Sequence, residues 1–107
     1  MERVLSLLDL IGEAEYSTML KMVKKELPAK FSGIKKAPSR KASLHSLKGM
    51  CYGLGLDPLG KHIALIEQTL INGGERTAEV HLNALPAKVL LEISELEQFL
   101  KTYKSAS

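Results

Sequence analysis

The sequence of 107 residues contains no tryptophan, a single cysteine and no long apolar run. One thiol cannot form an internal disulfide, and Cys51 falls on a predicted apolar stripe, so we expect it to pack as a small hydrophobic side chain. A membrane-spanning helix needs about 18 or more apolar residues in succession, which no segment provides. The N terminus also lacks the basic and apolar regions of a secretory signal. We therefore expect a cytoplasmic protein.

Acidic side chains are missing from a long central part of the sequence. No Asp or Glu occurs between Glu26 and Asp57, although the net charge of the chain is only +3. From residue 21 to residue 41 there are eight basic residues against one acid, Glu26: Lys21, Lys24, Lys25, Lys30, Lys35, Lys36, Arg40 and Lys41. A charge run of this kind is most often a solvated surface, but it could also bind an acidic protein or nucleic acid.

Apolar residues recur at spacings of three and four almost throughout, and no alternating pattern typical of strands competes with them. The pattern predicts helices over residues 4–11, 13–36, 39–53, 57–71 and 75–103. Because short connections favour antiparallel neighbours, we expect an all-α fold, an antiparallel up-and-down four-helix bundle with a short additional N-terminal helix. The length indicates one domain, in which residues 1–12 form the N-terminal cap helix and residues 13–104 the bundle.

Proline and short polar residues predict where helices begin and where they bend. Ser39 is expected to cap the third helix, and Asp57 to cap the fourth, with Pro58 in its first turn. Pro28 and Pro86 lie inside predicted helices and each removes a backbone hydrogen bond. We therefore expect a kink or break just before Pro28 and a kink at Pro86.

The tract around His45 separates polar from apolar residues onto opposite faces of a predicted helix. Residues three and four apart share a face, so His45, Lys48 and Gly49 lie together, with Lys41 and Tyr52 on the same strip. The opposite, core-facing stripe consists of Leu44, Leu47, Cys51 and Leu54. An outward imidazole beside a cation, with a glycine clearing the surface, suits close approach by an anionic group.

A neutral imidazole is a nucleophile near neutral pH and can carry a phosphoryl group. Since no carboxylate lies near His45 in the sequence, we expect a solitary nucleophile, without a local Ser-His-Asp triad or a carboxylate-oriented metal ligand. His62 and His81 flank apolar stripes and are interpreted as boundary histidines. The three histidines lack the spacing of a zinc site, so we expect the chain to bind no metal or cofactor.

This tract and the residues that follow it resemble the histidine-containing phosphotransfer (HPt) domains of bacterial multistep phosphorelays. The similar residues are His45-Ser46-Leu47-Lys48-Gly49, then Leu54-Gly55-Leu56 and Leu59, and finally the pair Ile66-Glu67. The resemblance covers residues 13–104. Met50 and Cys51 stand where the family usually has small residues, which predicts bulkier helix packing near the site.

The resemblance implies that Nε2 of His45 accepts a phosphoryl group from the aspartate of one receiver domain and passes it to another. Lys48 would help to hold the phosphoryl oxygens, and Gly49 would make room for the receiver. The receiver would supply Mg²⁺, whereas this chain would be a monomeric phosphocarrier without kinase activity of its own. The expected receiver-binding residues are Lys41, Ala42, Ser46, Tyr52 and Leu56.

Other interpretations of the same residues stay open. The basic segment 21–41 could make the chain a helical module that binds nucleic acid, although long helices do not suggest a compact helix-turn-helix. A domain that docks on a receiver only to inhibit it is a third interpretation, against which the intact His45 argues. Gly49 could instead permit close contact between two helices.

Overall fold

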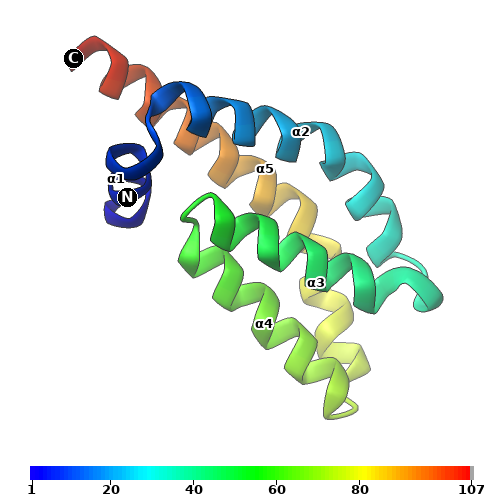
Figure 1. Ribbon diagram of the computed structural model, residues 1–107. Coiled ribbons are helices and arrows are strands. Elements are labelled where there is room, and N and C mark those ends of the chain that lie inside the picture. The colour runs from blue at the N-terminus through cyan, green and yellow to red at the C-terminus, as the bar shows by residue number, and fades with distance from the viewer. Residues whose placement is uncertain (107) are drawn as a thin grey trace.

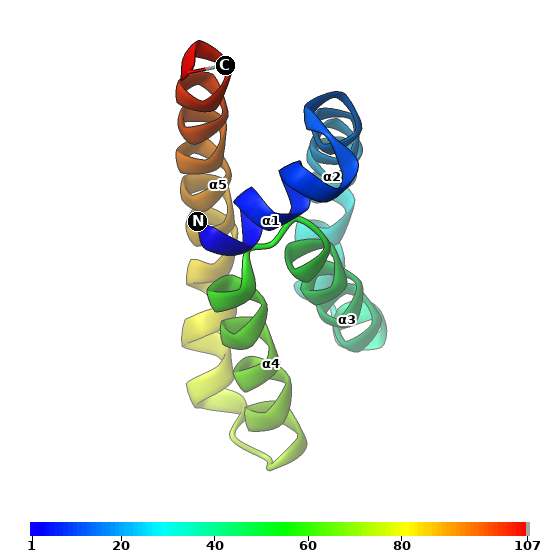
Figure 2. The same ribbon diagram turned by 60° about the vertical axis from the view of Figure 1, so that its left-hand side comes forward.

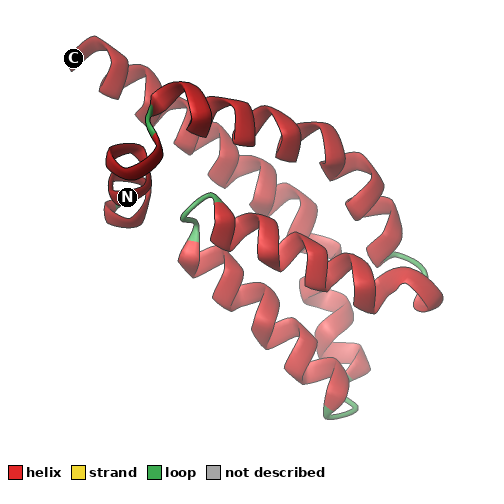
Figure 3. Ribbon diagram, in the orientation of Figure 1, coloured by secondary structure: helices red, strands yellow, loops and turns green. Residues whose placement is uncertain are grey.

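The computed structural model of the protein describes residues 1–106, with side chains described as far as Lys104. Over this range the chain forms helices joined by short turns, without a strand (Figures 1 and 3). The helices are α1 (Glu2–Ile11), α2 (Glu13–Ile34), α3 (Ala37–Gly53), α4 (Asp57–Ile71) and α5 (Glu75–Ala106). The prediction of an all-α fold is confirmed. None of the helices in the described part of the chain combines the length and the apolar character needed to cross a membrane.

Each helix packs against the next one along the chain. α1 contacts α2, α2 contacts α3, α3 contacts α4 and α4 contacts α5. Figure 2 shows α4 beside α5 and, on the other side of the molecule, α3 beside α2. The turns after α1, α3 and α4 each contain one glycine with positive φ, namely Gly12 (86°), Gly55 (82°) and Gly73 (81°). Residues other than glycine rarely adopt a positive φ, so these three glycines permit the short connections that bring neighbouring helices together.

The core consists of the apolar stripes that the sequence predicts. All four stripe residues of the third predicted helix are buried: Leu44, Leu47, Cys51 and Leu54. The stripe of α5 is buried as well: Leu82, Leu85, Val89, Ile93, Leu96 and Leu100. Tyr16 on α2 is fully buried, and its hydroxyl donates a hydrogen bond of 2.5 Å to the carbonyl of Leu54. Burial raises the pKa of Tyr16 to about 12, so its phenol stays protonated and joins α2 to the turn after α3.

The short helix α1 covers the end of the molecule at which α3 turns into α4. Val4 and Leu8 are buried, which accounts for the apolar spacing in this segment. The backbone of α1 lies directly on Gly55, since a Cβ there would come within 3.1 Å of the backbone nitrogen of Val4 and 3.0 Å of Leu7. The expected cap helix therefore forms, and Gly55 serves it both by its positive φ and by its missing side chain.

The break expected before Pro28 does not occur. α2 runs without interruption through Pro28, and α5 runs without interruption through Pro86. A proline removes one hydrogen bond, but the buried Leu27 and Leu85 beside the two prolines hold each helix on the core. Figure 1 shows the ribbon of α2 arching across the molecule instead of breaking.

Two predicted helix caps are wrong by a few residues. α3 begins at Ala37 with Lys36 at its N-cap, so Ser39 already lies inside the helix. The Ser39 hydroxyl donates to the carbonyl of Gly33 at 2.8 Å and thereby ties the start of α3 to the end of α2. α4 has Leu56 at its N-cap and Asp57 as its first residue, where the negative charge still favours the helix N terminus.

Candidate functional site

His45 projects from the exposed face of α3. Its side chain is 77% exposed, whereas Leu44 and Leu47, on either side of it in the sequence, are fully buried. This contrast follows from the helical period, because burying the leucine stripe turns the intervening residues toward solvent. The predicted orientation of His45 is confirmed, and its imidazole is open to an incoming molecule.

Glu67 of α4 lies between His45 and Lys48. One carboxylate oxygen forms an ion pair of 2.7 Å with the ammonium of Lys48. The other oxygen lies 3.9 Å from Nδ1 of His45, which is too long for a direct hydrogen bond but close enough for electrostatic attraction. Glu67 and Lys48 are largely shielded from solvent, with 17% and 24% of their side chains exposed. The pair therefore gives His45 a negative group on its Nδ1 side.

The expectation of a solitary nucleophile is therefore wrong. The stretch around His45 contains no acid, but the turn between α3 and α4 brings Glu67 back beside it. The adjacent Ile66 is 2% exposed and packs in the core, and the helical period then directs Glu67 to the α3 side of α4. A signal for this residue exists in the sequence, since Ile66-Glu67 is the pair by which the HPt resemblance continues into the next helix.

Gly49 lies on the open surface one turn beyond His45. A Cβ added at Gly49 would meet no atom within 4 Å, so the alternative that this glycine permits close helix packing is excluded. Gly60 on α4 provides the contrast, because a Cβ there would come within 2.8 Å of the ring of Tyr52. The two glycines therefore have different structural roles, the first facing free space and the second receiving an aromatic ring.

Some of the residues expected to bind a receiver lie on the surface of the protein, and others are partly or fully buried. Lys41 and Ala42 are exposed, and Tyr52 is 37% exposed with its ring over Gly60. Ser46 is partly buried, and its hydroxyl donates to Sδ of Met50 at 3.9 Å. Leu56 contradicts the expectation, since it is 5% exposed and belongs to the core. The turn at Gly55 changes the chain direction, so the periodicity of α3 no longer predicts where the next side chain points.

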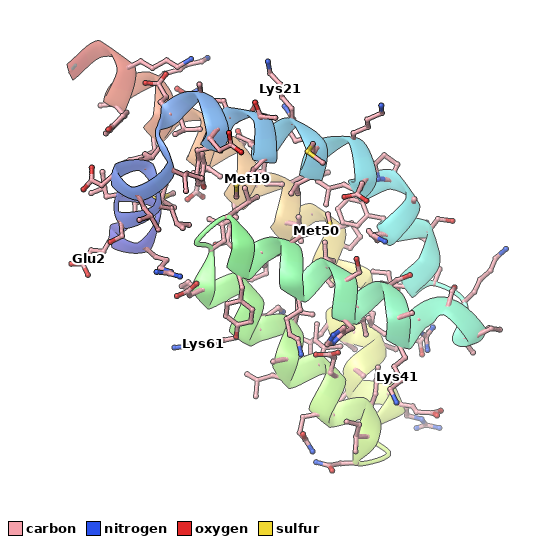
Figure 4. The ribbon with its side chains drawn as sticks, viewed as in Figure 1. Glu2, Met19, Lys21, Lys41, Met50 and Lys61 are labelled. Atoms are coloured by element: carbon pink, nitrogen blue, oxygen red, sulfur yellow. The ribbon has the colours of Figure 1, made fainter. Side chains whose placement is uncertain are left out.

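The bulky residues that depart from the family pattern do not crowd His45. Met50 is partly buried beside Met19 and Val23 of α2, on a different side of α3 from Lys41 (Figure 4). Cys51 is 4% exposed, and burial together with the charge of Glu92 raises its pKa to about 12. The thiol is therefore protonated at neutral pH, as expected for a packing residue.

A groove adjoins the His45 site along the contact between α3 and α4. It has a volume of about 310 Å³ and is lined by Ala37, Arg40, Lys41, Leu44, Glu67, Leu70, Ile71 and Glu75. Its lining combines apolar side chains of both helices with the charged Arg40, Lys41, Glu67 and Glu75. Lys41 and Glu67 belong both to the groove and to the surroundings of His45, so the two features form one continuous surface.

His62 and His81 lie against each other on α4 and α5. Their rings meet edge to face with centroids 5.5 Å apart. Burial lowers the pKa of His62, and electrostatic interactions with Lys88 and His81 lower it further. Among residues 1–106, no group of three His, Cys, Asp or Glu side chains is placed to hold a metal ion. His62 is partly buried and lies at the boundary between core and solvent, as the sequence predicts, whereas His81 is exposed and contradicts that prediction.

Comparison with known proteins leaves the site to be interpreted from its own geometry. No protein-family model matches the chain, and neither a characterised protein nor a solved structure is significantly similar to it.

Proposed function

We propose that this protein is a histidine phosphotransfer domain of a two-component phosphorelay. In this proposal α2 to α5 form an antiparallel up-and-down four-helix bundle that presents His45 on its side. His45 accepts a phosphoryl group from the aspartate of one receiver domain and donates it to another. The domain is cytoplasmic, binds no cofactor of its own and relies on Mg²⁺ held by the receiver.

The observation that carries the proposal is the grouping of an exposed His45 with Lys48 and Glu67. The imidazole is 77% exposed, while the carboxylate and ammonium beside it are shielded and joined at 2.7 Å. An ordinary surface histidine has no need of such a partly buried ion pair, which costs desolvation. A histidine that must carry an added positive charge is stabilised by the carboxylate of such a pair.

The chemistry needs Nε2 of His45 unprotonated and its Nδ1 protonated. The lone pair of Nε2 forms the new P–N bond as the P–O bond to the receiver aspartate breaks, and the aspartate carboxylate leaves with the electron pair. The product ring then carries a positive charge. Glu67, 3.9 Å from Nδ1, favours both the Nδ1-protonated tautomer and this charge. Lys48 supplies a cation one turn along α3 for the phosphoryl oxygens.

The surface around His45 supports docking of a protein that brings its own catalytic groups. Phosphoryl transfer depends mainly on positioning and on neutralising charge, so a receiver with its Mg²⁺ needs close access to the imidazole. Open space at Gly49 favours this access. The apolar residues that line the adjoining groove and the exposed ring of Tyr52 offer contact area, and Lys41 attracts the acidic surroundings of a receiver aspartate.

A label-transfer experiment tests the proposal. A panel of receiver domains, phosphorylated with a small radiolabelled phosphodonor in Mg²⁺, is mixed with the full chain. We expect label to pass to the chain, to be lost in mild acid and to persist in base, as for a phosphohistidine. His45→Gln should abolish labelling without changing the helical signal in circular dichroism.

His81→Gln is the matched control, because His81 is also an exposed histidine but lies outside the site. It should be labelled as the wild type is. Label that persists on His45→Gln would assign the acceptor to another residue. Strong binding of receivers without any transfer would favour the inhibitor interpretation instead.

A further inference from the structure

A cleft lies between the first half of α2 and the last part of α5. It has a volume of about 250 Å³, and its residues come from these two helices alone. Leu20 and Leu100, each 6% exposed, give it an apolar lining. In Figure 2 this is the end of the molecule at which α5 reaches the C terminus. We call it the α2/α5 cleft, and none of the residues proposed to take part in phosphotransfer belongs to it.

Four exposed lysines line the α2/α5 cleft, two from each helix. Lys21 and Lys24 belong to α2, and Lys101 and Lys104 belong to α5. A lysine side chain lays its apolar stem along a surface and keeps its ammonium group in water. The four stems therefore continue the leucine lining, while four positive charges gather around the opening.

Acidic side chains balance only half of this positive charge. The ammonium of Lys24 lies 2.7 Å from the carboxylate of Glu97, and the ammonium of Lys104 lies 3.3 Å from that of Glu13. The other lysine of each helix forms no ion pair within the described part of the chain. Two positive charges at the cleft are therefore uncompensated, one on each helix.

Ser17 adds a hydrogen-bond donor to the same cleft. It lies one turn before Lys21 on the same face of α2. The hydroxyl of the adjacent Thr18 donates to the carbonyl of Ala14 at 3.0 Å, as hydroxyls inside helices commonly do. The hydroxyl of Ser17 makes no such bond to the residues that the structure describes, so it is available to a ligand.

We propose that the α2/α5 cleft binds the anion of a medium-chain fatty acid. The ligand carboxylate lies between the ammonium groups of Lys21 and Lys101 and accepts a hydrogen bond from the hydroxyl of Ser17. The alkyl chain lies against Leu20 and Leu100. This inference does not rest on the proposed phosphotransfer function.

Charge, lining and size together select this class of ligand. The two uncompensated ammonium groups favour a carboxylate over a neutral or cationic group. The leucines and lysine stems favour an alkyl chain, which an inorganic anion or a nucleic acid backbone does not offer. Sites for drug-sized ligands measure roughly 300–1,000 Å³, so this smaller cleft suits a single chain of about ten carbons.

Titration calorimetry of the full chain with decanoate, well below the concentration at which micelles form, tests the inference. We expect one site with a dissociation constant of about 100 μM. Decyltrimethylammonium has the same chain with the opposite charge, and acetate has the carboxylate without the chain. Each should bind at least about tenfold more weakly than decanoate. Octanoate, which is shorter by two methylene groups, should also bind about tenfold more weakly.

Charge-reversal variants locate the site. Lys21→Glu and Lys101→Glu should each weaken decanoate binding about fivefold or more. Lys25→Glu changes the net charge equally at an exposed position of α2 outside the cleft, and should leave binding unchanged. Glu97→Gln should instead strengthen binding about two- to fivefold, because it removes a competing carboxylate from Lys24. Circular dichroism should show that all four variants are as helical as the wild type.

Three outcomes would overturn the proposal. The first is a chain that shows no saturable binding of decanoate in the millimolar range. The second is equal binding of decanoate and decyltrimethylammonium, which would mean that the lysines play no part. The third is an equal loss of binding in Lys21→Glu and Lys25→Glu, which would reduce the interaction to the net charge of the chain.

Discussion

Two histidine environments in this protein differ in burial and in the sign of the charge beside the ring. His45 has the carboxylate of Glu67 at 3.9 Å from Nδ1. His62 packs against the ring of His81, and burial with the cation Lys88 lowers its pKa. A ring that gains a phosphoryl group becomes positively charged, which a neighbouring carboxylate favours and which burial and a neighbouring cation oppose. Exposure and charged neighbours together therefore distinguish the surroundings of the two histidines.

Removing the carboxylate should make the His45 environment resemble that of His62. Glu67→Gln keeps the shape of the side chain but removes its charge. The variant therefore no longer stabilises the Nδ1-protonated tautomer of His45 or the positive charge of the phosphorylated ring. We expect transfer from a phosphorylated receiver to slow at least about tenfold, equivalent to about 1.4 kcal/mol. Rapid-quench measurement of the labelled chain gives the rate.

Glu97→Gln is the control for this variant. Glu97 also pairs with a lysine at 2.7 Å, namely Lys24, but far from His45 along the chain and on other helices. Loss of the Glu97 charge should leave the transfer rate unchanged. Equal rates for Glu67→Gln and the wild type would mean that the carboxylate only holds Lys48 in place.

The space around His45 should matter less than the charge but remain measurable. Gly49→Gln should slow transfer severalfold by obstructing the receiver, yet keep or raise the melting temperature, because glycine inside a helix costs about 1 kcal/mol. Gly60→Gln should do the opposite, lowering the melting temperature since its Cβ would collide with Tyr52. Thermal melts beside transfer assays separate the two effects. A large fall in the melting temperature of Gly49→Gln would contradict the open surface described above.

Acid should weaken the contact between α4 and α5 through His62. The pKa of His62 is lowered in the folded protein, so the folded state takes up a proton less readily than the unfolded chain does. The corresponding stability is present above the unfolded pKa of about 6.5 and is lost as the pH falls through the lowered pKa. Melting temperatures between pH 7.5 and 5.5 should decline, and His62→Gln should flatten the decline. An unchanged slope in this variant would remove His62 as its cause.

The smallest effect expected concerns Lys41. Lys41→Ala should slow transfer about two- to threefold at low salt and less at high salt, since it removes only long-range attraction by an exposed charge. If the chain instead binds nucleic acid, duplex DNA should bind tightly with a steep salt dependence, lost on neutralising Lys35 and Lys36. A mobility-shift titration distinguishes these outcomes.

Helical periodicity alone predicted the all-α fold and the outward orientation of His45. The spacing of Leu44, Leu47 and Cys51 specifies one buried face, and the exposure of His45 follows from it. The sequence Asn72-Gly73-Gly74 correctly predicted the end of α4, because the positive φ at Gly73 is a local property of the chain. These features are determined within a few residues, which is the range over which sequence patterns are informative.

The remaining features depend on how distant segments meet. Glu67 reaches His45 only because the turn at Gly55 sets the register of α4 against α3, which the composition around His45 does not reveal. Leu56 was misplaced for the same reason, since its direction is set by that turn and not by the period of α3. Ser39 was misassigned as a cap for a local reason, since α3 already begins at Ala37 with Pro38 in its first turn, where proline is favoured.

The ring of Tyr52 lying over Gly60 has a practical consequence for observing this protein at work. The chain has three tyrosines and no tryptophan, so its ultraviolet emission comes from tyrosine alone. Tyr16 is sealed inside the protein, whereas Tyr52 is 37% exposed on the same strip of α3 as His45. Contact with a receiver that lacks both tryptophan and tyrosine would thus change the emission of Tyr52, while the buried Tyr16 and the partly buried Tyr103 of α5 contribute a constant background. The molecule carries its own optical reporter of docking, next to the surface where docking is proposed.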